Sequence, residues 1–182
     1  MSHITDFSAM ETITDLTALQ RAVQKFCPTL EYVRGESHYR TWKDDHGGQL
    51  VGDYPVPPGW TKEEVGENAV DVIRVKPEHN NGKMYEIGVV PHKQKPGHYN
   101  LIADFWAQGN GILEQPGVGR AYRPTTKPGE PREREKAFDD LLEGYAMMEV
   151  AREAERQGDT VTFNQDEEGW YADINTEARL GV

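Results

Sequence analysis

Two runs of β-forming residues, 84–90 and 99–106, stand on either side of a polar connection that holds two prolines and a glycine. Both runs mix aromatic and β-branched side chains, which suit a half-buried pleated surface. Two such runs joined by a glycine-containing segment predict a β-hairpin with a long loop. Pro91 and Pro96 keep the strands from extending into that loop. We therefore expect this hairpin at the centre of an antiparallel sheet.

Two other stretches carry apolar residues at steps of three and four, the period of one face of an α-helix. The first stripe consists of Leu16, Leu19, Val23 and Phe26, and the second of Phe138, Leu141, Leu142, Tyr145, Met148 and Ala151. Thr14 or Asp15 would cap the first helix, and Pro28 would end it. The second helix is expected at about 136–157, with Gly158 as its natural C-terminal stop.

The remaining β-rich stretches complete the element order. Further strands are expected at 4–13, 29–34, 69–76, 160–164 and 170–175. The order β-α-β, β-β-β, α-β-β predicts an α+β domain, a largely antiparallel sheet with two helices on one face. Residues 1–182 suit a single domain, interrupted by two long loop insertions at about 35–68 and 107–135.

The charge of the chain is unevenly distributed. The formal net charge of −11 argues against a globally basic nucleic-acid binder. By segment, residues 1–28 carry −1, residues 29–68 carry −4, residues 69–136 carry +3 and residues 137–182 carry −9. The pattern fits a basic binding face held apart from an acidic back. It also fits a solvated surface with no binding role.

Cysteine usage and apolar runs bear on location. The only cysteine, Cys27, rules out an intrachain disulfide, fits a reducing compartment and is expected to be a packed thiol. No apolar run approaches the length of a membrane span. Met1-Ser2-His3 offers neither the basic region nor the apolar core of a signal peptide. We expect a cytoplasmic protein with no membrane contact.

Short motifs along the chain support a family resemblance. They are Met1-Ser2-His3, Asp15-Leu16 before the first helix, Tyr85-Glu86-Ile87-Gly88, Leu101-Ile102-Ala103-Asp104-Phe105-Trp106, and Tyr145-Ala146 leading to Gln157-Gly158. In this order they resemble a small family of conserved hypothetical proteins in chloroplast and cyanobacterial genomes, with phage members, classed as a domain of unknown function. The resemblance implies a fold rather than an activity. Family members run shorter at both insertions, where a specialised role would reside.

The candidate catalytic residues are one pair of carboxylates, Glu86 and Asp104. The six histidines include no i,i+4 pair on an expected helix and there is no cysteine cluster, so we expect neither a metal nor a cofactor. Glu86 and Asp104 lie on adjacent expected strands and could serve a metal-dependent hydrolase near Lys93 or Lys95. The alternative is a structural hydrogen bond at Asp104. We favour a protein that is not an enzyme.

Nucleic-acid binding has a wider basis in the sequence. Single-strand binders combine cations that follow the phosphates with aromatic rings that stack on bases. Both kinds of side chain alternate in the two insertions and the hairpin loop. The candidate nucleic-acid-binding residues are Arg34, Tyr39, Arg40, Trp42, Lys43, Lys93, Lys95, Arg120, Tyr122, Arg123, Lys127 and Arg132. We therefore predict a protein that binds nucleic acid, preferentially single-stranded DNA.

The acidic segment 137–182 would stay off the nucleic acid and could contact a basic protein such as a polymerase. A looser resemblance, carried by no residue motif, is to accessory proteins of lytic phages that encode their own RNA polymerases, and it implies a role in transcription or replication. The alternative is a protein-binding scaffold module with no nucleic-acid role. A homo-oligomer is compatible with either hypothesis.

Overall fold

The computed structural model describes residues 4–6, 13–48, 59–104, 111–119, 138–166 and 169–176. Its elements are β1 (Ile4–Asp6), α1 (Leu16–Phe26), β2 (Leu30–Arg34), α2 (Trp42–Asp45), β3 (Asp71–Val75), β4 (Ile87–Pro91), β5 (Tyr99–Asp104), the 3-10 helix η1 (Ile112–Glu114), α4 (Asp139–Arg156), β6 (Thr160–Gln165) and β7 (Trp170–Asn175). The α+β class predicted from the sequence is confirmed.

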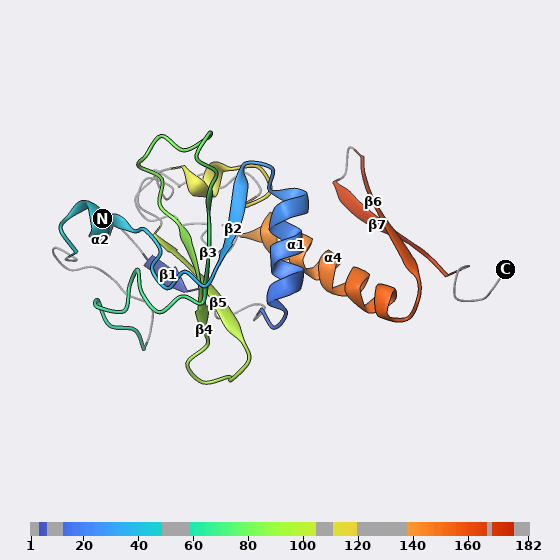
Figure 1. The fold of residues 1–182 in the computed structure, drawn as a ribbon, viewed down its shortest axis with the longest axis horizontal. Helices are drawn as coiled ribbons and strands as arrows, with labels where there is room; N and C mark the ends of the chain where they lie inside the picture. Colours follow the sequence, from blue (N-terminus) through green and yellow to red (C-terminus); the bar gives the residue numbers. More distant parts are fainter. Residues whose placement is uncertain are drawn as a thin grey trace, which may run out of the picture.

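The main sheet has five strands in the order β1-β5-β4-β3-β2, and each neighbouring pair is antiparallel (Figure 1). The predicted hairpin is β4–β5, and it lies at the centre of the sheet as expected. The strand β4 begins at Ile87 rather than at residue 84. The reason is that Glu86 N–H donates to the carbonyl of Arg40, 2.9 Å away, so this part of the chain pairs with the first insertion.

One face of the main sheet packs against the two long helices. Buried side chains of α1 and of the first turns of α4 share a core with strand residues that include Ile73, Ile87 and Leu101. The N-terminus of α1 is held by Asp15, whose carboxylate accepts the N–H groups of Thr17 and Ala18. This is the N-cap geometry expected from the sequence.

The opposite face of the sheet is covered by the first insertion. A second apolar cluster joins Tyr39, Trp60, Val65 and Ala69 to the strand residues Val72, Val90 and Ile102. Aromatic rings from a segment with little periodicity therefore become core residues. They bury the second face of the sheet, which would otherwise expose apolar side chains to water.

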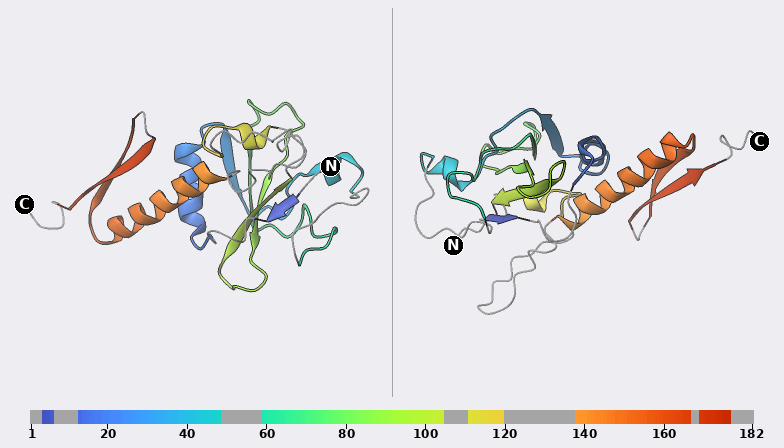
Figure 2. Two further views of the ribbon diagram at one scale, coloured as in Figure 1. Left: turned by 180° about the vertical axis from the view of Figure 1, so that it is seen from behind. Right: turned by 90° about the horizontal axis from the view of Figure 1, so that it is seen from below.

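The C-terminal hairpin forms a sheet of its own. Strands β6 and β7 pair with each other and with no other strand in the described residues. The hairpin packs on α4, which runs away from the main sheet (Figure 2). Gly158 follows the last turn of α4 with a φ of +88°, a left-handed conformation that ends the helix as predicted.

Candidate binding groove between the helices and the C-terminal hairpin

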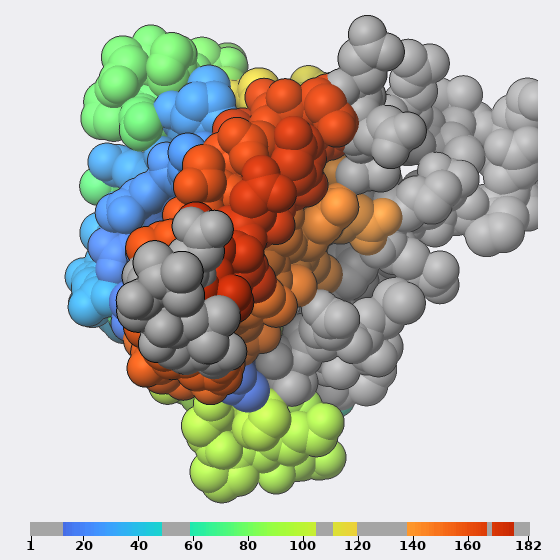
Figure 3. Space-filling model, turned by 90° about the vertical axis from the view of Figure 1, so that its right-hand side faces the viewer, coloured from blue at the N-terminus to red at the C-terminus, as the bar shows by residue number. Residues whose placement is uncertain are grey.

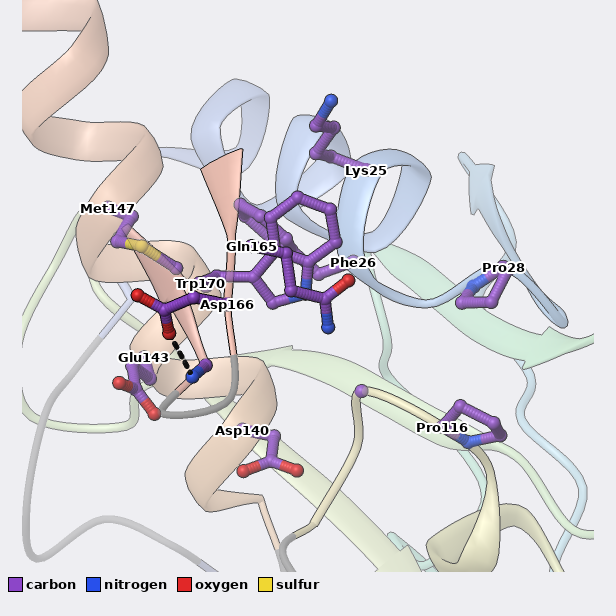
Figure 4. A pocket seen from close by; sticks show the side chains of 13 residues that line it. Lys25, Phe26, Pro28, Pro116, Asp140, Glu143, Met147, Gln165, Asp166 and Trp170 are labelled. Carbon is purple, nitrogen blue, oxygen red and sulfur yellow. Dashed lines mark hydrogen bonds between the residues drawn. The ribbon is translucent and has the colours of Figure 1, made fainter. Parts of the chain in front are cut away.

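A groove of about 680 Å³ opens where α1, α4 and the tip of the C-terminal hairpin meet (Figure 4). Small-molecule and side-chain pockets in proteins usually span about 300–1,000 Å³. The lining residues come from four segments of the chain. They are Lys25, Phe26, Pro28, Pro116, Gly117, Asp140, Glu143, Gly144, Met147, Gln165, Asp166, Gly169 and Trp170.

Phe26 is the residue around which the groove is built. Two glycines allow its close approach to the neighbouring segments. A Cβ added at Gly144 would lie 2.7 Å from the Phe26 ring, and one added at Gly117 would lie 2.1 Å from the Phe26 carbonyl oxygen. A glycine in a helix interior costs about 1 kcal/mol relative to alanine. Gly144 therefore lowers the intrinsic stability of the helix and permits the close contact with Phe26.

Aromatic rings form the apolar part of the groove. The Phe26 ring meets Phe163 edge-on with centroids 5.7 Å apart and Trp170 with centroids 5.1 Å apart. The Lys25 ammonium lies 5.5 Å from the Trp170 centroid and 5.8 Å from that of Phe163. These are cation–π distances. The rings of Phe163 and Trp170 therefore already bind one cation of this chain.

The charged part of the lining is mostly negative. Asp140 and Glu143 come from the first turns of α4, and Asp166 comes from the hairpin tip, where its side chain accepts the Gly169 N–H at 3.1 Å. In Figure 4 the Lys25 ammonium points away from these three carboxylates. Burial and the negative charge of Asp140 raise the pKa of the Cys27 thiol to about 12. The field of Asp140 therefore reaches the end of α1.

A second, shallower hollow of about 390 Å³ continues from the groove around the hairpin tip. Asp166, Gly169 and Trp170 line both spaces, and Tyr171 is added in the second. Tyr171 is 44 % exposed. Together the two hollows make a track that runs from the end of α1 along the start of β7. A ligand longer than one side chain could follow it.

Two of the aromatic residues predicted to stack on bases, Tyr39 and Trp42, are already engaged within the protein. Tyr39 is fully buried against the far face of the sheet. The Trp42 ring stacks on His46 with centroids 3.5 Å apart, and its backbone N–H donates to Asp104 at 3.0 Å. Packing thus fixes Tyr39 as a core residue, and its ring cannot reach a base without leaving that core.

Three of the predicted cations form ion pairs with carboxylates of the same chain. Arg40 pairs with Asp45 at 2.7 Å and Lys93 with Glu64 at 2.8 Å. Lys43 lies 3.8 Å from Glu67, donates to the carbonyls of Glu63 and Val65, and its side chain is only 13 % exposed. Lys93 also lies 4.6 Å over the Trp60 ring. The Lys93 contacts hold the first insertion on the central hairpin, whereas the Arg40 and Lys43 contacts lie within the insertion.

Arg34 and Lys95 are exposed, and, unlike the exposed Lys93, neither forms an ion pair with another described residue. Arg34 is the last residue of β2 and pairs with Asp71, the first residue of β3. Asp71 also pairs with Val89 near the end of β4, and the hairpin loop that contains Lys95 follows β4 directly. Both residues therefore lie toward the same end of the sheet. Other candidates lie outside the described residues, namely Arg120, Tyr122, Arg123, Lys127 and Arg132.

Glu86 and Asp104 do lie beside each other, as the hydrolase hypothesis requires, because Ile87 pairs with Ala103. Both carboxylates bind the backbone of the first insertion: Glu86 accepts the Arg40 N–H at 2.7 Å and Asp104 accepts that of Trp42. Burial raises the pKa of Glu86. Lys93 and Lys95 follow the opposite end of β4, which corrects their expected place beside this pair.

Within the described ranges, no group of three or more histidine, cysteine, aspartate and glutamate side chains is arranged to hold a metal ion. The same part of the chain contains no helix that is both long and apolar enough to cross a bilayer. The carboxylates of Glu86 and Asp104 accept the backbone N–H groups of Arg40 and Trp42. They fasten the insertion to the end of the central hairpin.

The sequence interpretation did not assign the groove residues. Phe26 belongs to the first predicted helical stripe, but its partners come from segments far along the chain. Gly144 in the middle of a helix was the available signal, because an interior glycine often marks a close approach. The negative charge of segment 137–182 is a second signal, because Asp140, Glu143 and Asp166 belong to this segment.

Comparison with family models, curated proteins and solved structures finds no match for the chain. The family resemblance stated for the sequence therefore stays a prediction.

Proposed function

We propose that this chain is a non-enzymatic binding module whose groove receives a positively charged side chain from a basic partner protein. The observation that carries the proposal is the groove itself, where three carboxylates stand around the rings of Phe26 and Trp170. A lysine or arginine side chain combines an apolar stem with a charged end. It matches a site with an aromatic floor and an acidic rim.

The charge of the whole C-terminal region supports the same class of partner. Residues 137–182 carry a net charge of −9. A surface of this sign attracts a basic protein and repels the phosphates of a nucleic acid. Arginine is also the cation that stacks best on aromatic faces, so an arginine side chain suits the rings better than lysine does.

The experiment is a calorimetric titration of the full chain with a blocked peptide of alternating arginine and valine. A matched peptide with glutamate in place of arginine is the control ligand. We expect binding of the arginine peptide alone, weakening as salt is added because the groove is partly exposed. Equal binding of the glutamate peptide, or no binding of either, would reject the proposal.

Variants locate the site. Asp140→Asn combined with Glu143→Gln should weaken binding of the arginine peptide about tenfold. The reason is that two partly exposed ion pairs contribute up to about 1 kcal/mol each, and about 1.4 kcal/mol is a factor of ten. Glu153→Gln is the matched control, because Glu153 is exposed on the same helix outside the groove and pairs with Arg156. It should leave the affinity nearly unchanged.

Single-stranded nucleic acid is a second candidate ligand. The observation in its favour is the exposed pair Arg34 and Lys95, which lie toward one end of the sheet without a carboxylate partner among the described residues. This end is separate from the acidic C-terminal region. The second function would therefore use a different surface, and the salt dependence of binding tests it.

A further inference from the structure

In the described part of the chain, no other strand pairs with the outer edges of the C-terminal hairpin. It consists of β6 and β7 alone, and α4 contacts both strands, so the helix covers a face of the ribbon and not an edge. In Figure 3 the red hairpin strands lie in front of α4 on this side of the molecule. An isolated two-stranded ribbon is only marginally stable, and here packing on α4 supports one face of the ribbon. The outer strand edges keep backbone groups with which an added strand could pair.

The phase of the hairpin hydrogen bonds identifies the backbone groups at the edge of β6. Asp166 N–H donates to the Gly169 carbonyl, so these two residues form a hydrogen-bonded pair. In an antiparallel ladder such pairs alternate with pairs whose backbone groups point outward. In the register Gln165↔Trp170, Phe163↔Ala172 and Val161↔Ile174, the outward set on β6 is Val161, Phe163 and Gln165.

The sequence of β6 lacks the usual protection of an edge strand. Natural edges carry charged residues, prolines or bulges that prevent pairing with another chain. Residues Thr160–Gln165 read Thr-Val-Thr-Phe-Asn-Gln, with no charge and no proline. β-branched residues and phenylalanine also favour the extended conformation. The edge of β6 is therefore suited to accept a strand.

Charges beside this edge define the partner. Asp166 directly follows β6. Asp173 lies on the neighbouring strand β7, and the Asp173 carboxylate accepts a hydrogen bond from Asn164 Nδ2 at 2.6 Å. A second copy of the chain would bring the same negative charges together. A segment with lysine or arginine beside its extended part would complement them.

We infer that β6 accepts an extended segment of the basic partner as a third strand of the hairpin sheet. The inference rests on the proposed function, because Gln165 at the end of β6 also lines the groove. A segment that pairs along Val161, Phe163 and Gln165 is led to the groove, where its next cationic side chain meets Asp140 and Glu143. Backbone pairing sets the length and direction of the bound segment, and the groove sets its preference for positively charged side chains.

The test compares two peptides of alternating arginine and valine that differ only in the backbone. In one, the amides that would face β6 are N-methylated, which removes the donors and keeps every charge. The unmodified peptide should bind at least tenfold more tightly and slow amide hydrogen exchange at Val161, Phe163 and Gln165. Equal affinities would overturn strand addition while leaving the groove proposal intact. Absence of binding by both peptides would overturn both proposals.

Two variants of one residue test the same edge from the protein side. Gln165→Pro removes an outward N–H, whereas Gln165→Ala removes the side chain and keeps that N–H. The proline variant should lose at least tenfold in peptide affinity relative to the alanine variant, with unchanged circular dichroism in both. Equal affinity for the two variants overturns the inference. So does concentration-dependent dimerisation of the free chain that Gln165→Pro abolishes, since the edge would then serve a second copy.

Discussion

The ring of Tyr39 packs directly against Gly88 on the sheet face that the first insertion covers. A Cβ built on Gly88 would lie 2.5 Å from Tyr39 Cδ1 and 2.6 Å from its Cε1. Glycine in the interior of a central strand normally weakens it, and a close approach of another group is the usual reason for it. Here the group that approaches is a fully buried aromatic ring.

Replacing Gly88 by alanine should therefore destabilise the protein by about 1–3 kcal/mol, the usual cost of forcing extra volume into a packed core. Chemical denaturation measures the change in the free energy of unfolding. In a Tyr39→Leu background the same replacement should cost much less, because the smaller side chain leaves room for the methyl group. An equal cost in both backgrounds would mean that Tyr39 does not press on residue 88.

Leu141 should contribute to stability through burial between α4 and the sheet. Its side chain is 1 % exposed and belongs to the main core. Leu141→Ala is expected to cost about 2–5 kcal/mol, the range for removing a buried leucine side chain. Val150 is the matched control on the same helix, since it is 54 % exposed. Val150→Ala should change the free energy of unfolding by less than about 0.5 kcal/mol.

Two glutamates should respond to pH with opposite signs. Burial raises the pKa of Glu86 in the folded protein. Ionisation of this carboxyl group therefore costs more free energy in the folded protein than in the unfolded chain. The stability linked to this group is present below the unfolded pKa of about 4.3 and is lost as pH rises through the folded value. Glu86→Gln should therefore stabilise the protein at pH 7, with a difference that vanishes on acidification.

Glu155 provides the opposite case. A hydrogen bond from Arg21 lowers the pKa of Glu155 in the folded protein. Its contribution is present above about pH 4.3 and is lost as pH falls through the lowered folded value. Glu155→Gln should destabilise the protein at pH 7 and have no effect in strong acid. Denaturation of both variants across this pH range checks the two signs, and a shared sign would contradict the assignment.

Arg34 and Lys95 should control any binding of single-stranded DNA by the described part of the chain. Removing one cation that binds a phosphate of a single strand reduces the slope of log K against log salt by about 0.7. Arg34→Ala with Lys95→Ala should weaken binding and flatten the slope by up to about 1.4.

Gel shifts at several salt concentrations measure this slope. Arg156→Ala is the control, because Arg156 lies in the acidic region and pairs with Glu153. Undetectable affinity of the wild type at low salt would exclude this second function. Unchanged affinity in the double variant would place the phosphate-binding residues elsewhere.

The sequence by itself determined the elements that depend on a local repeat. The stripe from Leu16 to Phe26 and the stripe around Leu141 became helices, since a helix places residues three and four apart on one face. The central hairpin and the closing hairpin followed from β-rich runs with turn residues between them. The helix stop at Gly158 was equally local, because only its own backbone conformation decides it.

Only the tertiary structure decided what the side chains between these elements do. Tyr39 and Trp42 look alike in the sequence, yet one is a core ring and the other stacks on His46. The sequence predicted that Lys93 binds a phosphate, but in the folded chain Lys93 forms an ion pair with Glu64. The groove joins Phe26 to Trp170 across most of the chain. Such contacts depend on residues that meet only after the chain has folded, so no local pattern could predict them.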